Sequence, residues 1–558
     1  MEIKRNRNTI YILAAIIFLA AVLRLWGIGA GDPVGDEVLY AFRAVGLLDY
    51  DVAEFQTTPL QWFDGNIPWW TKLSFHDHPP LVFLIQHFFI KIFGENIFAF
   101  RFSAALFGIA SVYLIYKLGA LLFSPLVGII SALILAVSSN HILISRVGLQ
   151  EPYVIFFLLL FSYALVRSLK NDNFLWLVGL SMGLGFLTKY TLIFITVPVL
   201  FIYFIIFRRE YFWNKKFWMN IILAILIFSP VLIYNFGLYR AVGHFDFQFS
   251  YIFGQHPEVW KTAPGKEEAG TILDRIRNFL PNLIQSNSWL FLLMSFLGLS
   301  ALFKSRFLLV SLVFLVFLIA GFIGPQMRFL SMLVPFLALG IGFLIYSVYQ
   351  QFPKLKTTII YFFAAFIIFE IVYSVNSQLI YASKGPSPWF YSQKLRYENY
   401  NWGFAELGKY LDRELSGKMP AFVFDARYKF IEALQAKTVA LRKQKGAEPY
   451  PALIIYDGNM LNGPQIWYLD RLQIYHGWPV LKTEDYQSFL AQNGQDYFTK
   501  AGFNYFYFIA MTQNVPLKKP ERLTETGGLF EKELLSRGYS SVFLYNKKGI
   551  EVFRIYKF

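Results

Sequence analysis

The sequence predicts a polytopic α-helical membrane protein with a soluble α/β domain at its C-terminal end. Of its 558 residues, 56% are hydrophobic and 16% are charged, whereas soluble globular chains are nearer 45–50% apolar and about 25% charged. The apolar residues gather in blocks of roughly 18–22, enough for a helix to cross a hydrocarbon core of ~30 Å. From about residue 378 the composition becomes charged and soluble-like.

We expect about eleven membrane spans, with thirteen as the upper limit of the count. The expected spans are 9–28, 98–118, 125–144, 152–169, 174–189, 190–207, 217–235, 288–303, 307–323, 327–349 and 357–377. Segment 78–94 is apolar too, but it is only about fourteen residues long after its two prolines, and runs of that length are usually interfacial or re-entrant. We therefore predict an interfacial helix there.

The distribution of basic residues fixes the predicted orientation. With the N-terminus in the cytoplasm, every short turn assigned to the inside carries Lys or Arg, as the positive-inside rule requires. These residues are Lys117, Arg167, Lys170, Arg208, Arg209, Lys215, Lys216, Lys304, Arg306, Lys354 and Lys356. This topology predicts a plasma (inner) membrane protein with an extracytoplasmic C-terminal domain. It also explains the net charge of +15 without a nucleic-acid partner.

Two domains are predicted. Residues 1–377 form a transmembrane catalytic domain with external loops at 29–97 and 236–287, and residues 378–558 form a soluble α/β domain. Its expected strands are 421–425, 452–457, 503–510, 541–546 and 551–556, with a helix at 403–415. The first apolar run follows three basic residues and precedes a segment with candidate functional residues, so we expect an anchor and not a cleaved signal peptide.

Acids, histidines and cations from five separate segments fall on the predicted outer face. They are Asp36 and Glu37 in "GDEVLYAF", His76, Asp77 and His78 in "FHDHPPL", Arg146 and Glu151 in "SRVGLQEP", Lys189 in "GLGFLTKYT" and Arg328 in "GPQMRFL". Ionisable groups at span ends suggest function, although snorkelling Lys and Arg are a structural alternative for each cation.

This set of residues suggests group transfer at the outer membrane surface. Carboxylates can deprotonate an acceptor hydroxyl, and cations can hold a departing phosphate. The chain has no Cys, which excludes disulfides, thiol catalysis and Cys-ligated metal. No Walker loop or GxGxxG offers a nucleotide site, so a lipid phosphate is the expected activated donor.

In their order and spacing, "GDEVLYAF", "FHDHPPL", "SRVGLQEPYVIFFLL" and "GLGFLTKYT" resemble the bacterial branch of the GT-C glycosyltransferases. This branch includes relatives of protein O-mannosyltransferases and aminoarabinose transferase (glycosyltransferase families 39 and 83), and the resemblance covers about residues 10–350. It implies the GT-C fold and transfer of a hexose or pentose from a polyprenyl-phosphate donor, with inversion. The acceptor, a protein, a lipid or a glycan, lies outside the cytoplasm.

The resemblance also implies roles for single residues. Asp36 would be the general base, with Glu37 beside it, and Glu151 would occupy a second acidic position that is usually Asp. Lys189, Arg328 and Arg146 would contact the lipid phosphate. Aminoarabinose transferases carry Glu-Lys-Pro-Pro where this chain has Asp77-His78-Pro79-Pro80, a departure that favours a hexosyl or mannosyl-type enzyme.

The residues leave three further questions open. Asp36, Glu37, His76, Asp77 and His78 could bind a divalent metal, but their spacing fits no compact motif and no cofactor is required. A transporter or flippase of lipid-linked sugars is the alternative function, against which stand the lack of an inverted repeat and the position of the acidic pair in a loop. A receptor would need far fewer spans.

The expected partners are the polyprenyl-phosphate-linked sugar, membrane lipids and an unidentified acceptor, with no nucleic acid.

Overall fold

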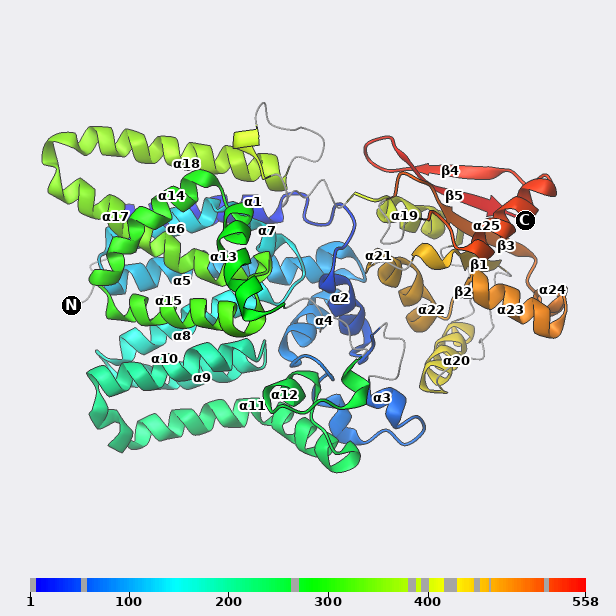
Figure 1. The fold of residues 1–558 in the computed structure, drawn as a ribbon, viewed down its shortest axis with the longest axis horizontal. Coiled ribbons are helices and arrows are strands. Elements are labelled where there is room, and N and C mark those ends of the chain that lie inside the picture. The colour runs from blue at the N-terminus through cyan, green and yellow to red at the C-terminus, as the bar shows by residue number, and fades with distance from the viewer. Residues whose placement is uncertain are drawn as a thin grey trace. The chain divides into compact units, whose positions relative to one another are not determined.

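A computed structural model describes residues 7–51, 58–261, 270–379, 388–392, 401–415, 429–445, 452–460, 463–515 and 521–558. The chain divides into two compact units. The first comprises Met1–Gly29, Val52–Thr58 and Pro68–Tyr397, and the second comprises Ala30–Asp51, Pro59–Ile67 and Glu398–Phe558. Figure 1 shows that the described part of the first unit is a helical bundle and that the β-sheet belongs to the second.

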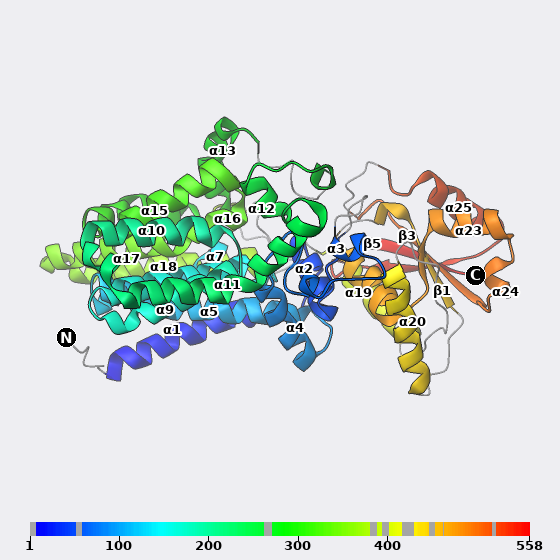
Figure 2. The same cartoon turned by 90° about the horizontal axis from the view of Figure 1, so that it is seen from below.

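Long apolar helices build the first unit, and α1 runs along the edge of the bundle beside α5 (Figure 2). The helices are α1 (Arg7–Leu25), α4 (Leu81–Phe93), α5 (Ile97–Leu122), α6 (Pro125–Val137), α7 (Ser139–Arg146), α8 (Glu151–Ser168), α9 (Leu175–Phe186), α10 (Thr191–Phe207), α11 (Lys215–Val242), α12 (Phe247–Ile252), α13 (Ile272–Ser286), α14 (Trp289–Gly298), α15 (Arg306–Leu318), α16 (Met327–Leu330), α17 (Val334–Gln351) and α18 (Lys356–Gln378). Short 3₁₀ or π segments are Trp69–Lys72, Asp172–Phe174, Arg209–Trp213, Glu258–Lys261, Leu299–Phe303, Ile319–Ile323, Ser331–Leu333, Pro353–Leu355 and Pro388–Phe390.

Among the described residues, seven helices are long and apolar enough to cross a membrane, or nine if each of two bent pairs is one span. The bent pairs are α6 with α7 and α13 with the helical segment that starts at Trp289. The predicted spans at 174–189 and 190–207 correspond to α9 and α10, which have only 12 and 17 residues. Hydropathy therefore finds these segments, but α9 is shorter than the ~17–25 residues of a spanning helix and α10 only reaches the lower limit of that range.

A buried arginine stabilises the break between α6 and α7, where the chain bends by 60°. Arg24 is fully buried and donates to the carbonyls of Leu135 and Ala136 and to Nδ1 of His141. The last carbonyls of a helix have no partner within the helix, so the guanidinium supplies the donors that the end of α6 lacks.

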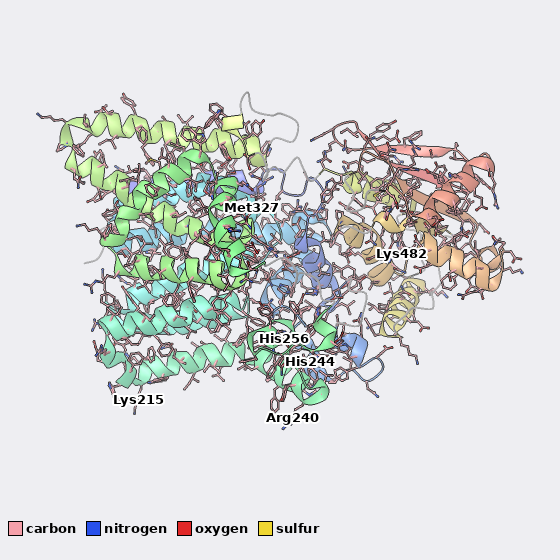
Figure 3. The ribbon with its side chains drawn as sticks, viewed as in Figure 1. Lys215, Arg240, His244, His256, Met327 and Lys482 are labelled. Atoms are coloured by element: carbon pink, nitrogen blue, oxygen red, sulfur yellow. The ribbon has the colours of Figure 1, made fainter. Side chains whose placement is uncertain are left out.

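The two ends of α11 lie at opposite ends of the helical bundle. Lys215 and Arg240 lie at opposite ends of this helix, and His244 and His256 lie beyond the Arg240 end (Figure 3). Met327, the first residue of α16, lies toward the same end. The loop that follows α11 and the start of α16 thus occupy one end of the bundle, and the basic turn at Lys215 occupies the other.

The second unit contains a five-stranded mixed sheet of order β2-β1-β3-β5-β4 in the described residues. β1 pairs in parallel with β2 and β3, and β5 is antiparallel to β3 and β4. The strands are β1 (Ala452–Tyr456), β2 (Val480–Lys482), β3 (Tyr505–Met511), β4 (Ser541–Tyr545) and β5 (Glu551–Lys557). The helices are α2 (Asp36–Gly46), α3 (Pro59–Trp62), α19 (Phe404–Leu415), α20 (Lys429–Gln444), α21 (Gly463–Gln465), α22 (Arg471–His476), α23 (Thr483–Asn493), α24 (Tyr497–Lys500) and α25 (Glu525–Ser536), with short 3₁₀ or π segments at Gly458–Met460 and Ile466–Asp470.

The structure confirms the predicted α/β character of the C-terminal part. Four expected strands correspond to β1, β3, β4 and β5, and the expected helix at 403–415 corresponds to α19. β2 was not expected, because a strand of three residues is too short to show a pattern. The fifth expected strand, at 421–425, lies outside the described residues.

The second unit also includes parts of the predicted first external loop. Residues 30–51 and 59–67, with α2 and α3, cluster with the C-terminal part of the chain. Asp36 and Glu37, the first two residues of α2, therefore belong to the same compact unit as the sheet. The domain boundary expected after residue 377 remains a prediction, since the contacts divide the chain along different lines.

Three buried carboxyl groups outside the spans give a testable pH dependence of stability. Burial raises the pKa of Asp32, Asp246 and Asp470 from 3.8 to about 6. Between these values the folded protein binds more protons than the unfolded chain, so the stability these groups contribute is present below pH ~4 and is lost as the pH rises through 6. We expect a higher melting temperature at pH 5 than at pH 7.5, and a smaller difference in Asp470→Asn. Equal differences in both proteins would contradict this.

Candidate active site

A buried ion pair forms the centre of the candidate site in the first unit. Nζ of Lys189 lies 2.7 Å from Oε1 of Glu151, and both side chains are almost fully buried. Glu151 is the first residue of α8, and Lys189 lies in the turn between α9 and α10. The aromatic ring of Phe329 lies beneath Nζ at 4.7 Å. The pair thus joins two of the five segments that the sequence predicts for the site.

Arg328 adds a second cation to this cluster. Its guanidinium also lies over Phe329, 4.8 Å from the ring centre, and it acts electrostatically on the Glu151 carboxylate. Nε of Arg328 donates to Oε1 of Gln326. Lys189 and Arg328 thus both act on the Glu151 carboxylate, and cations so placed are groups that can contact an anionic ligand.

The segment "HDHPPL" lies beside this cluster. The backbone N–H of Leu81 donates to the carbonyl of Leu187, two residues before Lys189. Nε2 of Gln86, on α4, donates to the carbonyl of Gly148, three residues before Glu151. The start of α4 therefore contacts both loops that provide the ion pair.

The loop after α11 holds the other end of the same segment. The N–H of Phe247 donates to the carbonyl of His76 over 2.8 Å, and Nε2 of Gln248 donates to the carbonyl of Asp77 over 2.6 Å. The ring of buried Trp260 stacks on His76, with 6.0 Å between the ring centres. The backbone of the His76–Asp77 segment is thus held in place by the loop that follows α11.

A fully buried carboxylate keeps that loop in its conformation. Asp246 accepts hydrogen bonds from the hydroxyl of Tyr190, from Nδ2 of Asn235 and from the N–H of Phe249. The backbone N–H of Asp246 in turn donates to Oδ1 of Asn235. Tyr190 directly follows Lys189 in the chain, so this network links the α12 loop to the turn that carries the lysine.

Arg146 has a different environment. Its Nη1 donates to the carbonyls of Leu23, Arg24 and Trp26 at the end of α1. These bonds cap a helix C-terminus, where cations are favourable. A structural task therefore accounts for the buried guanidinium, and its contact with the lipid phosphate remains a prediction. Arg101 is likewise buried and donates to the carbonyl of Ile28.

The adjacent acids of "GDEVLYAF" differ in exposure. Glu37 is fully buried, and its Oε1 accepts from the N–H of Val34 over 2.7 Å. Asp36 is half-buried in the first turn of α2. Of the two, Asp36 is therefore the one whose carboxylate a substrate hydroxyl could reach, and the buried Glu37 stabilises the helix start. Their catalytic roles remain predictions.

Two histidines and one aspartate offer metal-binding atoms in the first unit. Nδ1 of His78 lies 3.0 Å from Oδ2 of Asp77, and Nε2 of His76 lies 3.9 Å from the same oxygen. Ligands held at ~2.0–2.2 Å from one ion lie about 3–4 Å apart, so Asp77 could share an ion with either histidine, but the three residues do not form a group whose ligand atoms all lie within 4.8 Å among the described residues. A histidine nitrogen with a carboxylate oxygen suits a transition metal better than Mg²⁺.

Several residues of this region were not predicted from the sequence. Asp246, Gln248 and Trp260 follow a span in an ordinary-looking loop, and Asp32 precedes the "GDEVLYAF" motif without belonging to it. His244 lies against the ring of Trp260, and His256 is exposed. The sequence offers one signal for such residues, namely a charged or aromatic residue that comes directly after a span.

Known proteins share sequence with part of this chain. Residues 77–234 match the family model of dolichyl-phosphate-mannose-protein mannosyltransferases. Putative mannosyltransferase YycA of Bacillus subtilis is 31% identical over 135 residues, which are 24% of this chain and 20% of that protein. Putative mannosyltransferase YkcB of the same organism is 23% identical over 212 residues, 36% of this chain and 27% of that protein. The matches thus span only about a fifth to a quarter of these relatives' lengths.

Among solved structures, ArnT from Cupriavidus metallidurans bound to undecaprenyl phosphate is similar over nearly the whole chain. The TM-score is 0.54 at 12% identity, with 98% of this chain and 97% of that chain covered. The resemblance predicted from the four motifs is confirmed. The chain is a multi-pass membrane protein with the fold of the GT-C glycosyltransferases, completed by a small C-terminal sheet domain.

Proposed function

We propose that this protein is an integral membrane glycosyltransferase that moves a sugar from a polyprenyl-phosphate donor to an extracytoplasmic acceptor, with inversion. The observation that carries the proposal is the buried Lys189–Glu151 pair with Arg328 beside it. The family model and the undecaprenyl phosphate named for ArnT support a phosphate lipid as the donor.

Lys189 and Arg328 bind the donor phosphate in this proposal. Both cations lie over Phe329, whose face favours positive charge. Before the donor arrives, Glu151 neutralises Lys189, which would otherwise be a costly buried charge. A phosphate that binds here exchanges one anionic partner for another, and the cations then stabilise the charge that develops as it leaves.

Asp36 acts as the general base. Its carboxylate takes the proton of the acceptor hydroxyl while that oxygen forms a bond to the anomeric carbon and the bond from that carbon to the phosphate oxygen breaks. Polyprenyl phosphate departs from the opposite face, which inverts the configuration. A phosphate leaving group needs no general acid, unlike the paired carboxyls of glycoside hydrolases.

The sugar is a hexose of the mannosyl type, and the reaction takes place on the outer side of the plasma membrane. The family model and both Bacillus relatives support mannosyl transfer, and His78 stands where aminoarabinose transferases carry Lys. The basic turn at Lys215 lies at the opposite end of α11 from the loop with Asp246, which is consistent with this orientation.

A metal is not needed for the reaction as proposed. If one binds, Asp77 with His76 or His78 would hold it, and it would supply positive charge to the departing phosphate. Because the two cations already supply that charge, we expect an excess of EDTA to lower the transfer rate by less than about twofold. Activity that falls on chelation and returns with Mn²⁺ or Zn²⁺ would contradict this expectation and assign the metal to these residues.

Purified protein in lipid nanodiscs can be given radiolabelled polyprenyl-phosphate mannose or glucose and a crude envelope acceptor. The proposal predicts that label appears in the acceptor and that an equal amount of polyprenyl phosphate is released, with mannose preferred. Reconstitution in closed vesicles tests the alternative. An intact donor that crosses the bilayer, with no cleavage by the nanodisc samples, would identify a transporter of lipid-linked sugars.

A further inference from the structure

Helix α2, which begins with Asp36 and Glu37, is an element of the second unit. Its N-cap is Gly35, whose φ of +53° is a conformation that residues other than glycine rarely adopt. Most of its following residues are buried, among them Val38, Ala41 and Phe42 at 0% exposure. One short helix cannot bury such a face alone, so its position depends on what it packs against.

Asp32 ties the approach to this helix to the C-terminal part of the chain. Its fully buried carboxylate accepts three backbone N–H groups, from Trp402 at 2.5 Å, from Gly403 at 3.0 Å and from Ala405 at 2.7 Å. These donors lie at the start of α19, so the carboxylate satisfies the unpaired N–H groups of that helix end. Asp32 is only four residues before Asp36, and its three partners lie about 370 residues further along the chain.

Tyr475 holds the other end of α2. Its hydroxyl donates to the carbonyl of Phe42 over 2.9 Å, and the two rings lie 4.9 Å apart. A Cβ on Gly46 would come within 2.3 Å of the Tyr475 ring, so only glycine permits this contact. Phe42 also packs on Tyr50, which hydrogen-bonds to buried Asp470. The last turns of α2 are therefore fixed to α22 and the segment before it.

A third contact involves the first turn of α2. A Cβ built on Gly463, the first residue of α21, would lie 3.3 Å from Cγ2 of Val38 and 3.6 Å from the carbonyl oxygen of Gly35. Gly35 and Val38 flank Asp36 and Glu37. The backbone of α21 thus packs directly against the turn that presents the proposed base.

From these three contacts we propose that the C-terminal part of the second unit, residues 398–558, positions Asp36 for catalysis. It is then part of the catalytic machinery and not a separate acceptor-binding module. Asp32 and Tyr475 are positioning residues that act through α2. The inference rests on the proposed function of Asp36 as the base, and it adds that the sheet domain determines where this carboxylate lies.

The test compares Asp32→Ala with a matched control in the same unit. Asp64 also joins the first loop to the C-terminal part, since its carboxylate accepts the N–H groups of Lys429 and Phe430 at the start of α20. α20 does not carry Asp36, so Asp64→Ala removes a carboxylate that likewise accepts the N–H groups at a helix start, although Asp64 is exposed and Asp32 is buried. Both variants are purified to a monodisperse, folded fraction before kinetics.

Asp32→Ala should lower kcat by about 10- to 100-fold, the usual result of a small misplacement of a reacting group. The KM for the donor should stay within about twofold, because Lys189 and Arg328 bind the phosphate. Asp64→Ala should keep both constants close to wild type. A purely structural role would instead lower the yield of folded protein without separating kcat from KM.

A disulfide provides the rescue experiment. The chain has no cysteine. A Cβ built on Gly463 lies 3.3 Å from Cγ2 of Val38, so cysteines at these two positions come within reach of each other. The double variant Val38→Cys, Gly463→Cys should stay active when oxidised, and in the Asp32→Ala background oxidation should restore most of the lost kcat. Reduction should abolish this rescue.

Two outcomes would overturn the inference while leaving the proposed function intact. In both, wild type transfers sugar and Asp36→Asn does not. In the first, Asp32→Ala and Asp64→Ala have equal kcat; in the second, the oxidised disulfide fails to restore kcat to Asp32→Ala. If Asp36→Asn is as active as wild type, the assignment of the base itself is wrong, and the positioning of Asp36 has no catalytic meaning.

Discussion

Replacing Asp36 by Asn should lower the rate of sugar transfer by about 10²–10⁴-fold, the range that a general base contributes. The amide keeps the size of the carboxylate but cannot accept the proton of the acceptor hydroxyl. Asp36 is half-buried in the first turn of α2, so the change should disturb neither the core nor the donor site. Single-turnover transfer of labelled mannose from a preformed complex with the donor measures the chemical step directly.

Glu37→Gln is the control for this prediction. Glu37 is fully buried and accepts the N–H of Val34, so its loss should reduce the melting temperature more than the rate per folded molecule. Asp36→Asn should do the reverse. If the two variants lose activity equally and in proportion to their loss of stability, Asp36 is a structural residue. If Asp36→Asn transfers sugar as fast as wild type, Asp36 is not the general base.

Much of the fold follows from local patterns in the sequence. Blocks of apolar residues mark the long helices because a span must satisfy its own backbone and face lipid. The runs rich in aromatic and β-branched residues at 505–511 and 551–557 mark the strands β3 and β5. Apolar composition cannot distinguish a complete span from a shorter helix such as α9. Packing against neighbouring helices, and not composition, decides where that helix ends.

The candidate site was predictable only in part, for a physical reason. Lys189 and Glu151 stand out in the sequence because ionisable groups beside apolar spans are costly when they are buried, and the structure brings these two together. Asp32 and Asp246 look like ordinary loop acids in the sequence. Their importance depends on N–H groups and hydroxyls from distant segments, which no local pattern records. The assignment of α2 to the C-terminal unit is likewise a property of long-range contacts.

Replacing Lys189 by Gln should raise the KM for the donor by about 30- to 150-fold, the loss expected from one charge-assisted hydrogen bond of ~2–3 kcal/mol. It should also destabilise the protein, because breaking one partner of a buried ion pair leaves the other charge unpaired, which costs about 3–5 kcal/mol. The single variant therefore mixes two effects, on donor binding and on folding.

The double variant Lys189→Gln, Glu151→Gln separates them. It removes both charges of the pair, so most of the lost stability should return, as the thermal midpoint would report. Donor binding should not return, because the cation that meets the phosphate is still missing. Competition by polyprenyl phosphate, measured on wild type, both single variants and the double variant, completes this double-mutant cycle.

Glu151→Gln alone should bind the donor at least as well as wild type, since its Lys189 no longer has a competing carboxylate. If the double variant recovers both stability and donor affinity, Lys189 serves only to neutralise Glu151, and the phosphate must be bound elsewhere.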